Sequence, residues 1–207
     1  MVTNLSTSVT TLLFNLFMMK YAGADGVAAI TAVLYCQFLM ISFFLGFSMG
    51  TAPVVSYHYG ADHRAFLSHI LQKSYLFVVG TSVGIFLLGL GCAPLIAGLF
   101  FKTTSTVYPL AIHGLRLFSL SFLFAGVNIF TSGLFTALGN GRISAAISFS
   151  RTLLFTVLGI FIMSYFWQLD GLWLAIPVAE FCTIGVVLYF FRSLQTYYGI
   201  RLFVKGQ

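Results

Sequence analysis

The sequence predicts an all-α integral membrane protein, a bundle of six transmembrane helices, from its composition, its hydropathy and the spacing of its charges. Of the 207 residues, 59% are hydrophobic and only 7% are charged, against about 25% in soluble domains. The mean hydropathy is +1.01. A surface so poor in charge excludes a soluble enzyme and a nucleic-acid-binding protein, and it makes the lipid bilayer the expected surroundings.

The length of the chain sets the number of helices. A membrane-spanning helix needs about 20 apolar residues, so a chain of this size holds roughly six helices with their turns. Charged residues and glycine or proline clusters mark where one helix ends and the next begins. We expect one domain over residues 1–200, followed by a cytoplasmic tail at 201–207. Its helices are expected at 1–22, 26–58, 66–100, 106–138, 142–167 and 171–195.

Short turns separate these six segments. In chain order they are Gly23-Ala24-Asp25-Gly26, Tyr59-Gly60-Ala61-Asp62, Lys102-Thr103-Thr104-Ser105, Gly139-Asn140-Gly141 and Leu169-Asp170-Gly171. Asp25 and Asp170 are placed to cap the helices that follow them, and the glycines tolerate the positive φ of tight turns. Turns this short make consecutive helices antiparallel neighbours.

Basic residues are distributed unequally between the two ends of this bundle. One end, with the C-terminus, holds Arg64, Lys73, Arg142, Arg192, Arg201 and Lys205, whereas the other end holds only Lys20 and Lys102. Cytoplasmic turns carry the excess of basic residues in membrane proteins. We therefore expect a multi-pass protein of the cell membrane with both termini in the cytoplasm.

Two prolines and two glycines are candidates for helix packing and bending. Gly46 and Gly50 lie one turn apart and allow another helix to approach closely. Pro53, on the same segment, cannot donate a backbone hydrogen bond and is expected to kink the helix. Pro177 frees the carbonyl of Trp173 in the last segment in the same way. This combination is more typical of a moving bundle, although a static packing seam is the alternative.

Three charged residues fall inside the expected spans. Arg116, Arg151 and Glu180 each lie about 14–15 Å from the membrane surface, near the middle of the bilayer, and His113 lies one turn from Arg116. Charges at that depth cost several kcal/mol, so they are expected to face the interior of the bundle and to pair. Glu180, the one acid there, should bond Arg151 or Arg116. The pair is either a structural ion pair or a coupling site.

No motif for catalysis or metal binding accompanies these charges. The chain has no nucleophile elbow, phosphate-binding loop or paired carboxylates, so no catalytic residue and no enzyme activity are expected. His58, His63 and His69, with Asp62, lack the spacing of a metal site and are expected to lie in a solvated turn. No metal and no organic cofactor are expected.

Three motifs, in order along the chain, resemble one family. They are Gly46-x3-Gly50-x2-Pro53-x2-Ser56-Tyr57-x2-Gly60-Ala61, then Phe135-Thr136-Ala137-Leu138-Gly139-Asn140-Gly141-Arg142-Ile143-Ser144 followed by Ser150-Arg151-Thr152, and Asp170-Gly171-Leu172-Trp173-x3-Pro177-x2-Glu180. The set resembles the C-terminal lobe of multidrug and toxic compound extrusion (MATE) transporters, over nearly the whole chain.

The resemblance implies one lobe of a transporter that has twelve helices in two pseudo-symmetric lobes. Members of the family export drugs, other xenobiotics and organic cations in exchange for H⁺ or Na⁺, so one of these is the expected coupling ion. The expected partner is the missing N-terminal lobe or a second copy of this one. Some members carry coupling acids on the first and fourth helices of this lobe, whereas residues 1–22 and 106–138 contain no Asp or Glu.

The leading interpretation is half of a secondary active multidrug efflux antiporter. Small lipophilic or cationic substrates would lie against Phe, Tyr and Met side chains, with polar contacts from Asn15, Gln37 and Asn128. One alternative is a lipid-linked saccharide flippase of the same superfamily, in which Arg116 and Arg151 would make the cavity positive. Another is a partner lobe that assembles in the membrane without transporting anything.

Cysteine labelling tests the expected orientation. In a variant without Cys36, Cys92 and Cys182, Thr104→Cys should react with an impermeant maleimide in intact cells, because its turn is expected outside. Asn140→Cys should react only after permeabilisation. The reverse pattern would show that the lobe is inserted the other way round.

Overall fold

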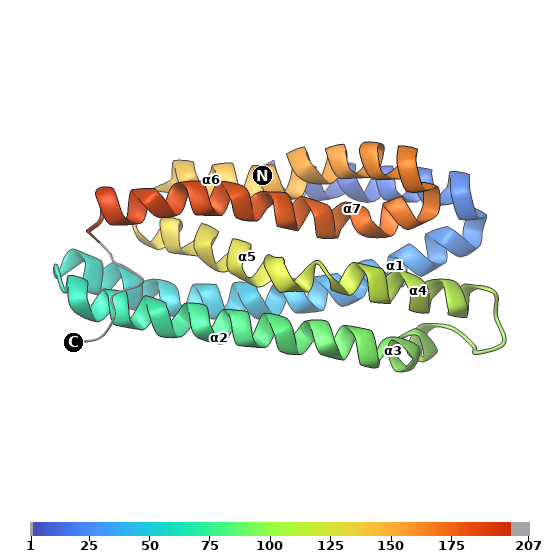
Figure 1. The fold of residues 1–207 in the computed structure, drawn as a ribbon, viewed down its shortest axis with the longest axis horizontal. Helices are drawn as coiled ribbons and strands as arrows, with labels where there is room; N and C mark the ends of the chain where they lie inside the picture. Colours follow the sequence, from blue (N-terminus) through green and yellow to red (C-terminus); the bar gives the residue numbers. More distant parts are fainter. Residues whose placement is uncertain (1, 200–207) are drawn as a thin grey trace.

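The computed structural model describes the backbone of residues 2–199 and the side chains of 6–192 and 196–199. The expected tail at 201–207, with Arg201 and Lys205, lies outside the described residues. Within 2–199 the chain is helical apart from short connections and contains no β-strand. The helices lie side by side along one common axis (Figure 1).

The helices follow one another with very short connections. Their bounds are α1 (Val2–Gly60), α2 (Arg64–Gly91), α3 (Ala93–Phe100), α4 (Val107–Ser119), α5 (Phe122–Ala137), α6 (Gly141–Phe149), the π-helix η1 (Ser150–Leu154) and α7 (Phe155–Thr196). The expected helix over 66–100 is divided at Cys92 into α2 and α3. The one over 106–138 is divided into α4 and α5, which meet at an angle of 50°.

Six passes result from these helices. Ser6–Gly60, Arg64–Gly91 and Gly141–Arg192 are long and apolar enough to cross a membrane, and the bent α4–α5 pair makes a further span. The first and third stretches each contain two helices, because the backbone leaves helical torsion angles at Gly23 and at Gln168. The chain folds back on itself at both breaks (Figure 1). The fold is therefore the predicted all-α membrane bundle of six helices.

The break inside α7 differs from the expected turn. Gln168 has φ 47° and ψ −116°. The positive φ of this turn is therefore at a glutamine, whereas we expected it at Gly171. Gly171 lies in the returning helix, where an added Cβ would meet the Met163 carbonyl. Glycine is needed there because the two arms of the hairpin touch. Asp170, expected as a cap, instead lies 2.8 Å from His113.

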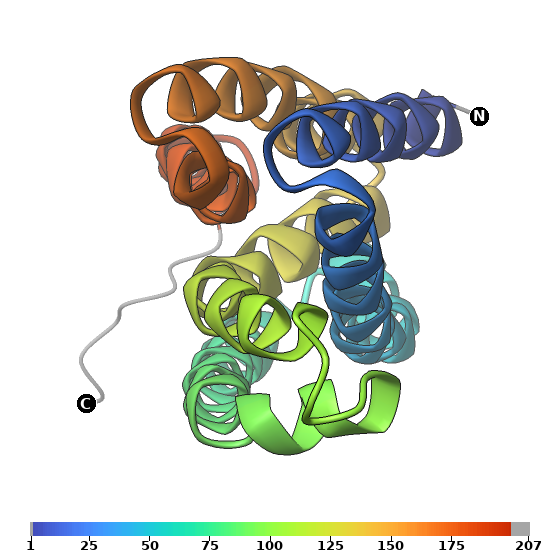
Figure 2. The ribbon, with the colours of Figure 1, turned by 90° about the vertical axis from the view of Figure 1, so that its right-hand side faces the viewer.

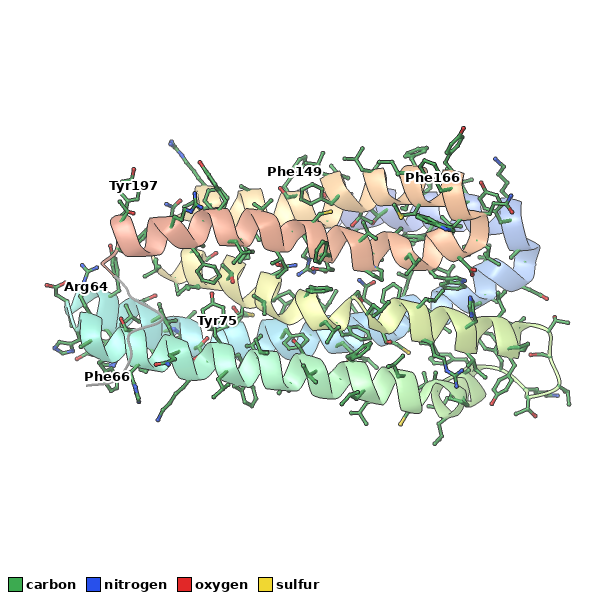
Figure 3. All side chains as sticks on the ribbon, viewed as in Figure 1. Arg64, Phe66, Tyr75, Phe149, Phe166 and Tyr197 are labelled. Carbon is green, nitrogen blue, oxygen red and sulfur yellow. The ribbon has the colours of Figure 1, made fainter. Side chains whose placement is uncertain are left out.

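The hydrophobic core consists of two clusters, one toward each end of the bundle. The first surrounds Trp173, whose side chain is fully buried, and the second includes Phe44, Phe130 and Phe135. Phe149 and Phe166 point away from the bundle instead (Figure 3). Large exposed apolar side chains of this kind are what a lipid-facing surface requires.

The close packing of α1 against α5 depends on glycines of α5 rather than on Gly46 and Gly50. An added Cβ on Gly126 would lie 2.6 Å from the ring of Phe44 in α1, and one on Gly133 would meet Ser48. The same atom on Gly46 or Gly50 would meet nothing within 4 Å, so no described residue packs against that pair. α1 keeps helical torsion angles through Pro53. The expected kink therefore does not interrupt the helix.

Two glycine substitutions separate tight packing from helix propensity. In Gly159→Ala the new Cβ would lie 2.7 Å from the backbone oxygen of Ala175, and overpacking of this kind typically costs about 1–3 kcal/mol. Gly80 has open space around it, so Gly80→Ala should gain about 0.5–1 kcal/mol from helix propensity. Thermal unfolding in detergent should move in opposite directions for the two variants. Equal shifts would contradict the packing of the α7 hairpin.

Candidate functional site

The buried carboxylate of Glu180 in α7 is the centre of the candidate site. Its side chain is 3% exposed. Nε of Arg151 lies 3.2 Å from its Oε1, and Nδ2 of Asn128 donates to its Oε2 at 2.7 Å. The same amide nitrogen donates to the backbone oxygen of Glu180 at 2.9 Å. Three helices therefore meet at one carboxyl group.

A π-helix positions the arginine of this trio. Arg151 lies in η1, between α6 and α7, where each turn of the helix is wider than in an α-helix because backbone hydrogen bonds join residues five apart instead of four. The Thr156 hydroxyl donates to the Arg151 carbonyl at 2.7 Å, which gives that oxygen a side-chain partner. π-bulges are rare and are frequently found at functional sites.

The polar trio lies between the two apolar clusters. Along α5, Phe122 belongs to one cluster and Ile129 to the other, with Asn128 at the boundary. Glu180 lies between Ile176 and Val187 of the two clusters in α7 in the same way. A buried ion costs several kcal/mol unless it is paired and hydrogen-bonded. Both carboxylate oxygens have such a donor, so the trio is an electrically neutral polar layer in an apolar bundle.

Arg116 is not part of this layer. We expected it to face the interior and to compete for Glu180, and that prediction is wrong: its side chain is exposed. The opposite face of α4 is the buried one, since an added Cβ on Gly114 would lie 2.7 Å from the Trp173 ring. His113, expected beside Arg116, bonds Asp170 at the end of the bundle and does not reach Glu180.

Asn128 does not line a substrate cavity in this lobe. We expected it to contact substrate, but its side chain is fully buried and bonds Glu180. The sequence offered no signal for this, because an asparagine in an apolar helix suits a cavity as well as a buried hydrogen bond. Gln37 is half-buried and lies outside the residues that line the groove described below.

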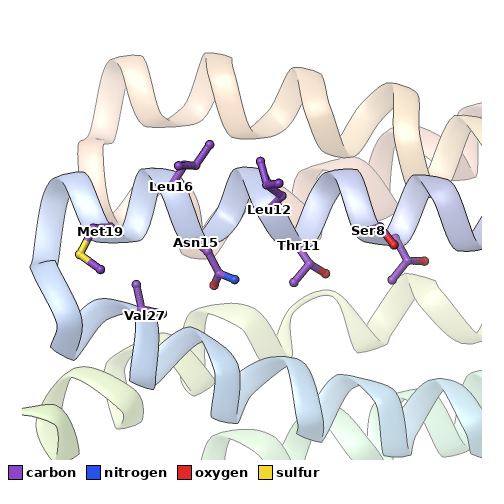
Figure 4. Close-up of a pocket in the computed structure, with 8 residues that line it drawn as sticks. Ser8, Thr11, Leu12, Asn15, Leu16, Met19 and Val27 are labelled. Carbon is purple, nitrogen blue, oxygen red and sulfur yellow. The ribbon is translucent and has the colours of Figure 1, made fainter.

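Asn15 lies in an open groove along the first half of α1. The groove has a volume of about 600 Å³ and is lined by Thr7, Ser8, Thr11, Leu12, Asn15, Leu16, Met19 and Val27. Asn15 and Thr11 point toward the second half of α1 and away from the neighbouring α7 (Figure 4). Oδ1 of Asn15 is buried without a hydrogen-bond partner among the described residues. The lining contains hydroxyl, amide, thioether and aliphatic groups and no charge.

His58 and His63 lie side by side at the α1–α2 turn. Nδ1 of His58 lies 3.4 Å from Nδ1 of His63, and Asp62 bonds Arg64 instead of joining them. Among residues 2–199, no three His, Cys, Asp or Glu side chains come together as metal ligands.

Comparison with known proteins identifies the family. The MatE family model matches residues 1–162. The chain belongs to the MatE family. A search of curated protein sequences found no match.

Solved MATE structures share the fold. A MOP superfamily transporter from Pyrococcus furiosus Vc1, described as having a binding pocket of reverse polarity, matches with a TM-score of 0.86 at 22% identity over 97% of this chain and 45% of that one. An outward-facing multidrug resistance MATE transporter matches with a TM-score of 0.86 at 22% identity, over 96% and 45% of the two chains. An inward-facing one matches with 0.87 at 21%, over 95% and 46%. The MatE chain described here spans less than half the length of these transporters.

A single and a double substitution test the ion pair. Arg151→Met leaves Glu180 buried without its cation and is expected to destabilise the lobe by about 3–5 kcal/mol. In Arg151→Met/Glu180→Met both charges give way to apolar chains of similar length, so the thermal midpoint in detergent should return toward that of the wild type. Arg142→Met, at an exposed arginine, is the control and should change little. A double variant no more stable than Arg151→Met would contradict the pairing.

Proposed function

We propose that this MatE chain is one half of a secondary active exporter of small lipophilic or cationic compounds, coupled to H⁺ or Na⁺. The observation that carries the proposal is a carboxylate, Glu180, buried at the middle of the lobe and held by an arginine on a π-helix. We place the transporter in the cell membrane with both termini in the cytoplasm, as the basic residues indicate.

The chemistry of a buried carboxylate explains how coupling works. In a low-dielectric surrounding the carboxylate needs one positive partner at a time: a guanidinium, a proton or a sodium ion. With Arg151 at 3.2 Å, that place is taken. When Arg151 withdraws, a proton or a sodium ion replaces it on Glu180. A π-helix is suited to such a movement because one residue can pass between π and α pairing without breaking the helix.

The groove beside Asn15 is the proposed substrate surface of this half. Its thioether and aliphatic side chains accept varied apolar shapes. The side-chain amide of Asn15, which lines the groove, is the group proposed to hydrogen-bond the substrate. Because the lining is uncharged, the charge that holds a cationic substrate comes from the second half, which is either an N-terminal lobe or another copy of this chain.

The alternative function, a lipid-linked saccharide flippase, was favoured by two arginines that do not line the groove. That alternative required Arg116 and Arg151 to make the cavity positive. Arg151 is neutralised by Glu180, and Arg116 lies on α4 outside the groove lining. A saccharide headgroup with a phosphate would find no basic residue among the lining residues.

Movement in this transporter occurs mainly between the two halves. The lobe matches an outward-facing and an inward-facing MATE structure about equally, with TM-scores of 0.86 and 0.87. Similar matches to both states support rocking of one bundle against the other around a shared site. The release of Arg151 from Glu180 is then a local event within a largely rigid lobe.

Glu180→Gln tests the coupling role in a transporter where this lobe is joined to a second one. The variant keeps the shape and removes the charge, so ion-gradient-driven efflux of ethidium from cells or liposomes should fall to background while folded protein remains in the membrane. Asp170→Asn, an exposed acid on the same helix, is the matched control and should retain efflux. The 207-residue chain alone should show none.

Two results would contradict the proposal. Unaltered efflux in Glu180→Gln would remove the coupling role. Loss of folded protein in that variant would show that Glu180 is needed for the fold itself, because the unpaired buried Arg151 would then be the dominant cost.

A further inference from the structure

Arg116 is a charged residue within a membrane span that has no part in the proposed transport mechanism. Its side chain is exposed, although it lies within the α4–α5 span, one helical turn beyond His113. An arginine on the outside of a membrane bundle is costly unless an anion or water reaches its guanidinium. Exposed charges in spans are therefore binding-site candidates.

The part of the chain that the structure describes supplies no anion for Arg116. The chain has four acidic residues. Asp62 is paired with Arg64, Asp170 with His113 and Glu180 with Arg151. Asp25 accepts a hydrogen bond from Thr106 at 2.5 Å. Arg116 thus has no carboxylate partner among the described residues.

The position of Arg116 around α4 is fixed by packing on both sides. Gly114 faces the Trp173 ring of α7, and Ser119 lies against Gly89 of α2. Arg116 falls in the sector between these contacts, together with the exposed side chains of Pro109 and His113. Residues three or four apart share one face of a helix. This face is therefore an open strip between α2 and α7.

The level of Arg116 in the membrane follows from its neighbour. His113 bonds Asp170, which lies two residues from the break that ends the outgoing arm of α7. Arg116 lies about 4.5 Å farther along α4, and its Cα–Cβ bond tilts back toward that end, where α4 begins. A long side chain that snorkels in this direction brings the guanidinium to the level of Asp170.

Aromatic side chains mark this level as the membrane interface. Tyr165, Phe166 and Trp167, next to the break, are 82%, 67% and 57% exposed. Phe166 lies at this end of the bundle and Tyr197 at the opposite end (Figure 3). Tyrosine and tryptophan are enriched where lipid headgroups meet the apolar core.

We infer that Arg116 binds the phosphodiester of an anionic lipid, in the leaflet at the Asp170 end of the bundle. A guanidinium pairs with phosphate oxygens through two N–H groups at once. The lipid's acyl chains then run from this level toward the middle of the bilayer. This site is separate from the substrate groove. In Figure 2, α1, which carries the groove, lies to the right of α4, and the final half of α7 lies above and to its left.

Lipid titration of the purified 207-residue chain tests the site. Native mass spectrometry from detergent should show a phosphatidylglycerol molecule bound more tightly than phosphatidylcholine. Arg116→Gln should weaken that binding about tenfold, the effect of one charge-assisted contact, and Arg116→Lys should restore part of it. Lys102→Gln removes the same charge from the same end of the bundle and should leave binding unchanged.

Each arm of the experiment has a result that overturns the inference. Equal weakening by Arg116→Gln and Lys102→Gln would mean general attraction by the charge at this end. Equal binding of phosphatidylglycerol by wild type and Arg116→Gln would place the lipid elsewhere. Stabilisation by inorganic phosphate alone, if it depends on Arg116, would show a free-anion site instead of a lipid site. Unchanged thermal unfolding of Arg116→Gln in phosphatidylcholine confirms that the variant is folded.

Discussion

The arrangement of the lobe depends on one constraint: a carboxylate buried in an apolar bundle needs a donor for each oxygen. Glu180 meets it with Arg151 and Asn128, which come from different helices. Apolar contacts between membrane helices have little directional preference, because lipid tails are as apolar as the side chains. The trio therefore fixes the register of three helices, where apolar packing alone would permit them to slide. The two hydrophobic clusters fill the space on either side of that layer.

Local backbone features follow from the same constraint. Arg151 reaches Glu180 from a π-helix, and the carbonyl of Arg151 bonds the Thr156 hydroxyl. Farther along the outgoing arm of the hairpin, Gly159 allows the backbone of Ala175 in the returning arm to approach closely. A bundle with ideal helices and larger residues at these points would hold the same polar groups farther apart. Sequence features that weaken a regular helix thus serve the polar layer.

The sequence predicted the turns between spans far better than it predicted which face of each helix is buried. Gly23 and the residues around Asp170 stand out because turns demand polar or glycine residues in an apolar chain. Faces are different: in a membrane span apolar residues occur all around the helix, so periodicity does not indicate which side is buried. For this reason Arg116 was expected inside and Asn128 in a cavity. The packing of Gly114 on Trp173 and of Ser119 on Gly89 decides which face of α4 is buried.

The α4–α5 pair separates two kinds of polar chemistry. Asn128 of α5 donates a hydrogen bond to a buried carboxylate, while Arg116 of α4 is exposed and has no acidic partner among the described residues. The groove of α1 receives neither charge, and its lining is neutral throughout. On the proposed function, this half selects substrates by shape and hydrogen bonding, through groups such as Asn15, because its lining carries no charge. Selection by charge then belongs to the proposed second half.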